Sequence, residues 1–143
     1  RKFPSTFLFL LELIYNQYKI IKPNLKDKKV ILQDRYDFSV LSYPTADRFY
    51  NRTIAKILSP LIIKPNVLVY FDVSLEERIK RLKESSYNKY HSLLSKNPQL
   101  ITSRESKYLD FYNKFNRKKT KIDTTNLTPE QSAKLLKQFI LAC

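Results

Sequence analysis

An acidic residue followed by an arginine, Asp34-Arg35, comes directly after a short apolar run at residues 29–33. A run rich in β-branched residues predicts a strand buried on both faces of a parallel sheet. The carboxyl ends of such strands face the crevice in which open α/β sheets bind ligands. There Arg35 would offer a planar donor fork to phosphate oxygens, and Asp34 would hold a substrate group or a metal-bound water. An ion pair at the strand end, or a helix N-cap, is the alternative that the pair alone leaves open.

The chain is strongly basic. Its 143 residues include 27 Lys and Arg against 13 Asp and Glu, which gives a formal net charge of +14. This charge indicates an anionic partner, which could be nucleic acid, acidic lipid or a polyphosphate compound. An AT-rich genome would also enrich lysine, so charge does not choose among these partners. The length predicts a single domain over residues 1–143 with a sizeable core.

Cysteine and glycine are both scarce. The one cysteine, Cys143, excludes an internal disulfide or a cysteine-built metal site and indicates a reducing, cytoplasmic setting. The apolar run at residues 7–15 is interrupted by Glu12 and is too short to span a bilayer, so we expect a buried helix and no membrane association. The chain has no glycine, although about 7% is usual, which indicates an incomplete domain.

Helical and strand patterns alternate along the chain. A strand of residues 67–71 ends at Asp72, and a short strand end is expected at residues 122–123. The segment 85–103 is polar and basic, and Pro98 is expected to break it, so we predict a mobile segment with one helical turn near residues 90–94. Alternation of this kind predicts an α/β fold with a parallel sheet. Periodicity and capping signals predict helices over residues 6–22 (ended by Pro23), 46–58, 75–83, 104–115 and 128–141.

Several stretches, in this order, resemble the thymidylate kinases, which are nucleoside monophosphate kinases among the P-loop phosphotransferases. The resemblance rests on Ile21-Lys22-Pro23, on residues 30–36 (Val-Ile-Leu-Gln-Asp-Arg-Tyr) with Ser39 and Tyr43, on residues 65–73 with Glu76, Glu77 and Arg81, and on Ile122-Asp123-Thr124. It implies a three-layer α/β fold, in which helices flank a parallel sheet. It also implies a nucleotide-kinase-like domain that is incomplete at its N-terminus, with a lid at about residues 84–104.

The resemblance implies an ATP-dependent transferase of nucleotide biosynthesis. The expected reaction converts a pyrimidine deoxynucleoside monophosphate to the diphosphate, with dTMP as the expected acceptor and Mg²⁺ as the cofactor. The partners would be ATP and the deoxynucleoside monophosphate. A homodimer is also implied, with the apolar helix of residues 6–22 packing against its twin.

The same resemblance assigns roles to single residues. Arg35 falls on the arginine that grips the acceptor phosphate, and Asp34 on the neighbouring acid that positions this phosphate and, through water, the magnesium ion. No further protein ligand to the metal is expected. Phe9 falls on the aromatic residue that stacks on thymine, and Glu105 on the acid after the lid. The substrate-binding residues are Phe9, Arg1, Tyr36, Ser39 and Tyr43. The lid cations over the ATP phosphates are Arg78, Arg81 and Arg104. The catalytic residues are Asp34, Arg35, Arg81 and Arg104.

Structural alternatives exist for these assignments. Phe9 lies on an apolar helix face and could belong to the core, and Tyr43 before a proline could pack a turn. Arg78 and Arg81 could form a solvated helix face, and Asp72 could cap the helix that follows it. The lone histidine, His91, cannot support a transition-metal site together with a single cysteine.

The sequence departs from the family pattern in two respects. Leu13 replaces the arginine that reads the base, Glu12 replaces a common aspartate and Pro44 replaces a glutamine, which leaves base identity open. A G-x-x-x-x-G-K-[ST] loop is absent from the glycine-free sequence. We therefore expect about 30 to 60 upstream residues that carry this loop and a strand lying between the two strands that end at Asp34 and Asp72.

Two other functions compete with the thymidylate kinase prediction. A deoxynucleoside kinase would phosphorylate a hydroxyl group and would also need an acid before the arginine. A non-catalytic kinase-like module would use the basic, tyrosine-rich surface to bind nucleotide or nucleic acid. A Walker loop encoded ahead of Arg1 would favour the enzyme.

Overall fold

The computed structural model describes residues 5–34, 36, 49–84 and 89–142 of the chain. They divide into two compact units, Arg1–Lys64 and Pro65–Cys143. Within the described residues, no helix combines the length and the apolar character needed to cross a lipid bilayer. The single-domain organisation expected from chain length stays a prediction.

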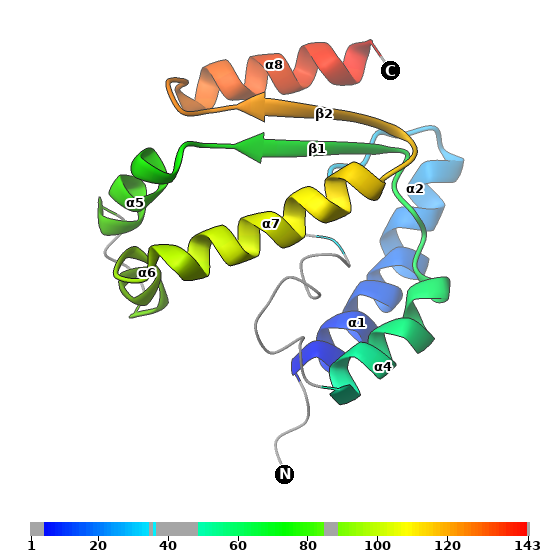
Figure 1. Cartoon of the computed structure of the whole chain (residues 1–143). Helices are drawn as coiled ribbons and strands as arrows, with labels where there is room; N and C mark the ends of the chain where they lie inside the picture. Colours follow the sequence, from blue (N-terminus) through cyan, green and yellow to red (C-terminus); the bar gives the residue numbers. More distant parts are fainter. Residues whose placement is uncertain (1–4, 35, 37–48, 85–88, 143) are drawn as a thin grey trace. The chain divides into compact units, whose positions relative to one another are not determined.

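Unit 1 is helical. Its first helix consists of α1 (Ser5–Asn16), the π-helical turn η1 (Gln17–Ile21) and α2 (Lys22–Lys26), and it is followed along the chain by α4 (Phe49–Leu58) and the 3-10 turn η3 (Ser59–Leu61). Helices α1 and α4 lie against each other (Figure 1). The core of unit 1 is made by Leu10, Leu13, Ile21, Tyr36 and Ile62, with Ile14, Ile31, Ile54 and Leu58 packed against it.

The expectation that Pro23 ends the first helix is wrong. The π turn η1 precedes it, and the Lys22 N–H donates to the Gln17 carbonyl five residues earlier. Pro23 then occupies one of the first two positions of α2. There the backbone φ fixed by its ring suits a helix, and the missing N–H costs little stability. The helix therefore continues to Lys26.

The first helix buries some of its apolar side chains and exposes others. Leu13 and Gln17 are 5% and 0% exposed, whereas Tyr15 and Tyr18 are 58% and 54% exposed. Both sides of α1 are apolar, so periodicity alone could not distinguish the core side from the solvent side. The glutamine lies inside because its amide binds backbone in the core.

The strand predicted at residues 29–33 is not formed. The segment has no regular secondary structure, although Ile31 packs on the core of unit 1 while Val30 and Leu32 are 72% and 68% exposed. A strand is defined by hydrogen bonds to a neighbouring strand, and the described residues provide none for this segment. Packed and exposed apolar side chains therefore alternate along this segment without forming a strand of a sheet.

Unit 2 is α/β. Strand β1 (Val67–Asp72) pairs in parallel with β2 (Lys118–Asp123), from Val67 opposite Lys118 to Asp72 opposite Asp123. The chain between the strands forms α5 (Leu75–Glu84), α6 (Lys89–Ser95) and α7 (Pro98–Lys114), and β2 leads into α8 (Pro129–Leu141). A parallel pair requires such a helical crossover. The α/β class with a parallel sheet is thus confirmed, here as a pair of strands.

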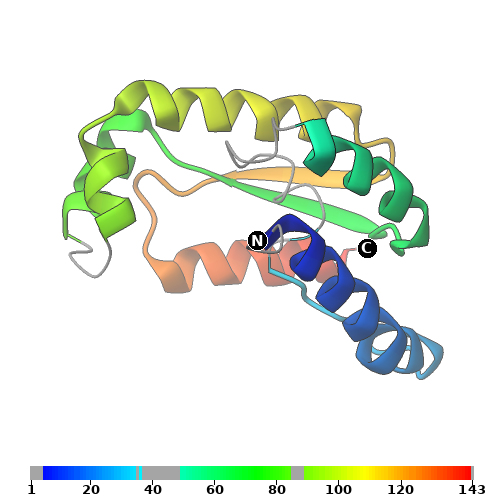
Figure 2. The same cartoon turned by 90° about the horizontal axis from the view of Figure 1, so that it is seen from below.

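Helices α7 and α8 lie on opposite faces of the β1–β2 pair (Figures 1 and 2). Two consecutive lysines of β2 reach these helices, one on each face. The Lys119 Nζ donates to the carbonyls of Tyr112 and Asn113 at 2.8 and 2.9 Å, at the end of α7. The Lys118 Nζ donates to the Ala142 carbonyl at 2.6 Å, just after α8. Each lysine neutralises a helix C-terminus, which carries a partial negative charge.

The predicted break at Pro98 is also wrong. Helix α7 begins at Pro98, six residues before Arg104, where the helix was expected to begin. It extends to Lys114. Proline is favoured at the first position of a helix, where its missing N–H would have no partner. The turn expected near residues 90–94 is confirmed as α6, so the described part of the segment 85–103 is mostly helical.

Replacing Thr128 by alanine is expected to lower the free energy of unfolding by about 1 kcal/mol. The Thr128 Oγ1 accepts from the Gln131 N–H at 3.3 Å, and the Gln131 Oε1 accepts from the Thr128 N–H at 2.8 Å. This capping box satisfies two donors at the start of α8. Urea denaturation followed by circular dichroism measures the loss. Thr128→Ser, which keeps the hydroxyl, should stay near wild type, and equal losses in both variants would contradict the capping role.

Candidate functional site at the strand ends

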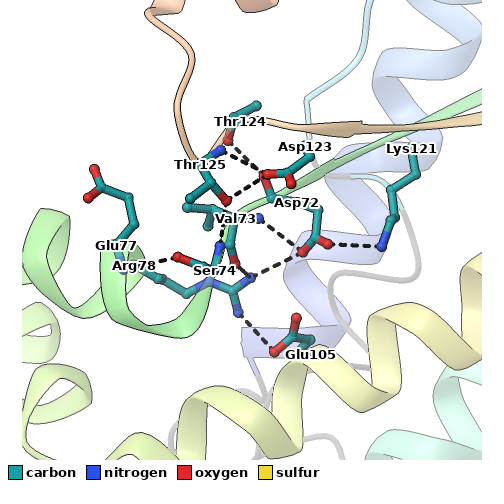
Figure 3. A network of polar contacts seen from close by, with 10 residues as sticks. All are labelled: Asp72, Val73, Ser74, Glu77, Arg78, Glu105, Lys121, Asp123, Thr124 and Thr125. Atoms are coloured by element: carbon teal, nitrogen blue, oxygen red, sulfur yellow. Dashed lines mark hydrogen bonds and ion pairs between the residues drawn. The ribbon is translucent and has the colours of Figure 1, made fainter.

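The carboxylate of Asp72, the last residue of β1, is held by two cations (Figure 3). The Lys121 Nζ lies 2.9 Å from Oδ2, and the Arg78 Nη2 lies 3.7 Å from Oδ1. The N–H of Val73 also donates to Oδ1 at 3.0 Å. The hydrogen bond with Asp72 raises the pKa of Lys121 above its usual range, so the Lys121 ammonium keeps its charge. Asp72 therefore joins β1, β2 and α5 at the carboxyl end of the sheet.

Arg78 connects this carboxylate to α7. Its Nη1 lies 3.5 Å from the Glu105 Oε2, and its Nη2 donates to the Val73 carbonyl at 3.1 Å. The side chains of Arg78 and Glu105 are 21% and 25% exposed, so solvent screens these pairs only in part. Two carboxylates and two cations balance each other in this cluster. The charged groups of this cluster therefore pair with one another within the protein.

Tyr70 lies beside the same cluster. Its ring centroid is 5.9 Å from that of Tyr112 on α7. Burial is the main cause that raises the pKa of Tyr70, the charges of Asp72 and Glu105 raise it further, and Arg78 opposes them. The hydroxyl of Tyr70 therefore stays protonated and neutral near pH 7, which suits a packing role.

Arg81 ties α5 to the loop after β2. Its Nη2 donates to the carbonyls of Thr124 and Thr125 at 2.9 and 3.4 Å, and its Nε lies 2.9 Å from the Glu77 Oε1. The N–H of Ser74 donates to the Thr125 Oγ1 at 2.9 Å. The Arg81 side chain is still 42% exposed. Its partners are carbonyls and one surface carboxylate, which an incoming anion could replace at small cost.

Asp123, the last residue of β2, forms a tight turn with Thr125. The N–H and the Oγ1 of Thr125 both donate to the Asp123 Oδ1, at 2.9 and 2.6 Å. These two hydrogen bonds favour the charged carboxylate and lower the pKa of Asp123 below its usual value. The turn fixes the two carbonyls that Arg81 binds.

Thr125→Val is expected to raise the pKa of Asp123 toward its ordinary value, because the variant keeps the N–H donor and loses the hydroxyl donor. Because the pKa of Asp123 is lowered in the folded state, the carboxylate stabilises the protein at pH values above its ordinary pKa of 3.8. This stabilisation is lost as the pH falls through the folded-state pKa. NMR titration of the Asp123 carboxyl carbon measures the shift. Thr102→Val on α7 is the control, and an unchanged Asp123 pKa in Thr125→Val would contradict this cause.

In unit 1, Asp34 carries an exposed carboxylate that has no partner among the described residues. Its backbone carbonyl accepts from the Gln33 Nε2 at 3.1 Å. Mg²⁺ retains several waters and binds through one or two carboxylates plus substrate phosphates. A single free carboxylate fits that donor set. Clusters of three or more metal-binding side chains are absent from the described parts of the chain.

The other predicted site residues have different surroundings. Phe9 on α1 is 36% exposed, so part of its ring is accessible, whereas Tyr36 is 7% exposed and belongs to the core. Arg104 lies half-buried in α7, next to the Glu105 that pairs with Arg78. Four of the predicted residues lie outside the described residues: Arg1, Arg35, Ser39 and Tyr43.

Comparison with known proteins identifies the family. A family model described as thymidylate kinase matches residues 4–135, which include the Asp34-Arg35-Tyr36 motif and both strands of unit 2. The chain belongs to the thymidylate kinase family. This family comprises nucleoside monophosphate kinases, which generally use ATP with Mg²⁺, so the resemblance stated from the sequence is confirmed.

Curated thymidylate kinase relatives match part of the chain. A probable thymidylate kinase of Thermococcus onnurineus (strain NA1) is 30% identical over 82 residues, which are 57% of this chain and 40% of the relative. A probable thymidylate kinase of Thermococcus gammatolerans (strain DSM 15229 / JCM 11827 / EJ3) is 29% identical over 82 residues, 57% of this chain and 39% of the relative. The match thus spans about two fifths of the length of each of these relatives. No solved structure matches the chain.

Sequence reasoning missed several residues at the strand ends of unit 2. Lys121 was part of a basic run, and Thr125 stood in a loop without a motif. Their partners, Asp72 and Ser74, are 49 and 51 positions away, so no local pattern could reveal the contacts. The register of β2 on β1 is the missing information, because it places Lys121 opposite Tyr70, two residues along the strand from Asp72.

Proposed function

We propose that the protein catalyses transfer of the γ-phosphoryl group of ATP to dTMP, with Mg²⁺, in the cytoplasm. The observation that carries this proposal is the family match across the Asp34-Arg35-Tyr36 motif, combined with an exposed Asp34 carboxylate that is free of partners among the described residues. Phosphoryl transfer needs positioning and charge stabilisation more than covalent chemistry. The chain supplies groups suited to both.

In this proposal Arg35 binds the acceptor phosphate through a bidentate guanidinium contact, and Asp34 orients that phosphate and the water shell of the metal. Magnesium, when bound, neutralises the charge of the donor phosphates. Phe9 offers a ring face to the base, and Ser39 and Tyr43 line the rest of the acceptor pocket together with Arg1. Each of these roles follows from the family position of the residue.

Lid cations would come from unit 2. Arg81 is exposed and held by exchangeable partners, so we assign it, with Arg104, to the donor phosphates. Arg78 is engaged by Asp72 and Glu105, and we assign it to fixing α5, the helix that bears Arg81. The segment of residues 84–104 would act as the lid.

The finer fold and assembly are part of the same proposal. The β1–β2 pair would belong to a larger three-layer parallel sheet, because β1 has one strand partner among the described residues and can take another on its free edge. A homodimer would form through the helix of residues 5–26, which exposes Leu8, Leu11, Tyr15 and Ile20. Light scattering should then give twice the monomer mass, and Leu11→Glu should give the monomer.

A phosphotransfer assay tests the function. The protein expressed from its own gene, with intact mass checked, is incubated with ATP, Mg²⁺ and one acceptor at a time: dTMP, dCMP, dUMP or thymidine. Turnover with dTMP above the other acceptors supports the proposal. Preference for thymidine would indicate a deoxynucleoside kinase, and no turnover with any acceptor would overturn the enzymatic function.

A nucleotide- or nucleic-acid-binding module is the second candidate. The formal net charge of +14 favours it. Such a module would bind single-stranded oligonucleotides with an affinity that falls steeply between 50 and 200 mM salt, on the order of 10³-fold for six or more phosphate contacts. Fluorescence anisotropy measures this dependence.

A further inference from the structure

Two side chains in unit 1 bind the two backbone groups of one residue, Ile63. The Gln17 Oε1 accepts from the Ile63 N–H at 2.7 Å, and the Tyr36 hydroxyl donates to the Ile63 carbonyl. Gln17 comes from the π turn of the first helix, and Tyr36 follows the Asp34-Arg35 pair. Both polar groups of Ile63, which follows η3, are therefore satisfied by side chains instead of by secondary structure.

Gln17 is an unusual residue for its surroundings. It is 0% exposed among the apolar residues of the core, and its Nε2 has no partner within the described part of the chain. Burial of an unpaired amide donor is costly, so an apolar residue would suit the position better for packing alone. The π turn of η1 places this residue inward, and such turns are frequent at functional sites. The hydrogen bond that the Gln17 Oε1 accepts from the Ile63 N–H therefore accounts for a glutamine at this position.

The contacts of Ile63 fix the backbone beside the phosphate-binding motif. Tyr36 is 7% exposed and its hydroxyl is held at Ile63, so its side chain cannot rotate away without exposing a polar group to the core. Asp34 lies two residues before this anchored tyrosine in the sequence. A fixed Tyr36 therefore limits how far the chain that bears the Asp34 carboxylate can move.

We propose that Gln17 and Tyr36 are positioning residues that act through Ile63 to hold Asp34 in place for the acceptor phosphate. The inference rests on the proposed function, in which Asp34 orients that phosphate. It adds two residues, neither of which needs to touch the substrate. Tyr36 thereby moves from the substrate-binding set to the support of Asp34.

Tyr36→Phe removes one hydroxyl and keeps the packed ring. We expect the KM for dTMP to rise about tenfold, because small misplacements of a substrate-binding group are costly, while the KM for ATP stays unchanged. Tyr18→Phe on the same unit is the matched control, since Tyr18 is 54% exposed, and it should match wild type. A general loss of folding would instead raise both KM values or reduce the active fraction, and that result would overturn the inference.

Gln17→Met, which keeps the length of the side chain and removes the acceptor, provides the second variant. It should raise the KM for dTMP by a similar factor, and the Tyr36→Phe/Gln17→Met double variant should be little worse than either single variant, because both act on Ile63. Amide hydrogen exchange supplies a readout besides activity: the Ile63 N–H should exchange at least tenfold faster in Gln17→Met than in wild type.

The outcomes separate the inference from the proposed function. An active wild-type protein whose KM for dTMP is unchanged in both variants would overturn the positioning role alone. Unchanged protection of the Ile63 N–H in Gln17→Met would overturn it as well. A wild-type protein that phosphorylates no acceptor would overturn the proposed function itself, whatever the exchange result.

Discussion

Arg35→Met should lower kcat/KM for dTMP by about 10²- to 10³-fold, the scale seen when one preorganised charge-stabilising donor is removed from an active site. The guanidinium would form two parallel hydrogen bonds with the acceptor phosphate, and methionine keeps the length of the side chain without any donor. Arg35→Lys should recover only part of the activity, because an ammonium group cannot form the planar fork. Steady-state kinetics with dTMP varied at saturating ATP measures the loss.

Lys29→Met is the matched control for Arg35→Met. Lys29 lies six positions earlier, and its side chain is 61% exposed in a pair with Asp27, so its removal should leave kcat/KM within twofold of wild type. The melting temperature of Arg35→Met should also stay near wild type. Equal activity of Arg35→Met and wild type would show that another group binds the acceptor phosphate.

Arg78→Met should lower the free energy of unfolding by about 2 to 3 kcal/mol, close to the range for breaking a partly buried ion pair. The change leaves the carboxylates of Asp72 and Glu105 facing each other without the guanidinium between them, and the Val73 carbonyl loses a donor. Urea denaturation followed by tyrosine fluorescence measures the loss. Because Arg78 holds α5, the same variant should also reduce kcat.

Lys80→Met on the same helix provides the control for Arg78→Met. Lys80 is 65% exposed and lies 3.8 Å from Glu77, so its removal should cost less than about 0.5 kcal/mol. Adding Glu105→Gln to Arg78→Met should restore part of the lost stability, because the charge of Glu105, which pairs with Arg78 in the wild type, disappears, whereas Asp72 keeps Lys121. A double variant that is less stable than Arg78→Met would contradict the proposed network.

The sequence predicted those elements whose signals are local. Strand β1 combines an apolar, β-branched run with a terminal acid, and α5 and α8 begin at serine and threonine caps, so no distant contact was needed to locate them. Pro23 and Pro98 were misplaced because a proline can stop one helix or begin the next. The choice depends on the hydrogen bonds of the preceding turn, which the residue types do not show.

The candidate site was predictable in its residue types and not in its partners. The motif at Asp34-Arg35 and the basic helix face with Arg78 and Arg81 were visible as patterns. The pairing of Arg78 with Glu105 and of Arg81 with the Thr124 carbonyl depends on how α7 and the loop after β2 pack, 43 positions away in the second case. Gln17 gave no signal, because a glutamine on a helix is usually solvent-exposed.

The parallel pairing of β1 with β2 has a consequence for biosynthesis. Ser74 and Thr125, which join the ends of the two strands, are 51 positions apart, and α5, α6 and α7 lie between β1 and β2 along the chain. Strand β2 must therefore emerge from the ribosome before β1 can pair with it. Until then the apolar strand β1 can pair with other nascent chains. Expression at low temperature or with chaperones should accordingly increase the recovered yield of this protein.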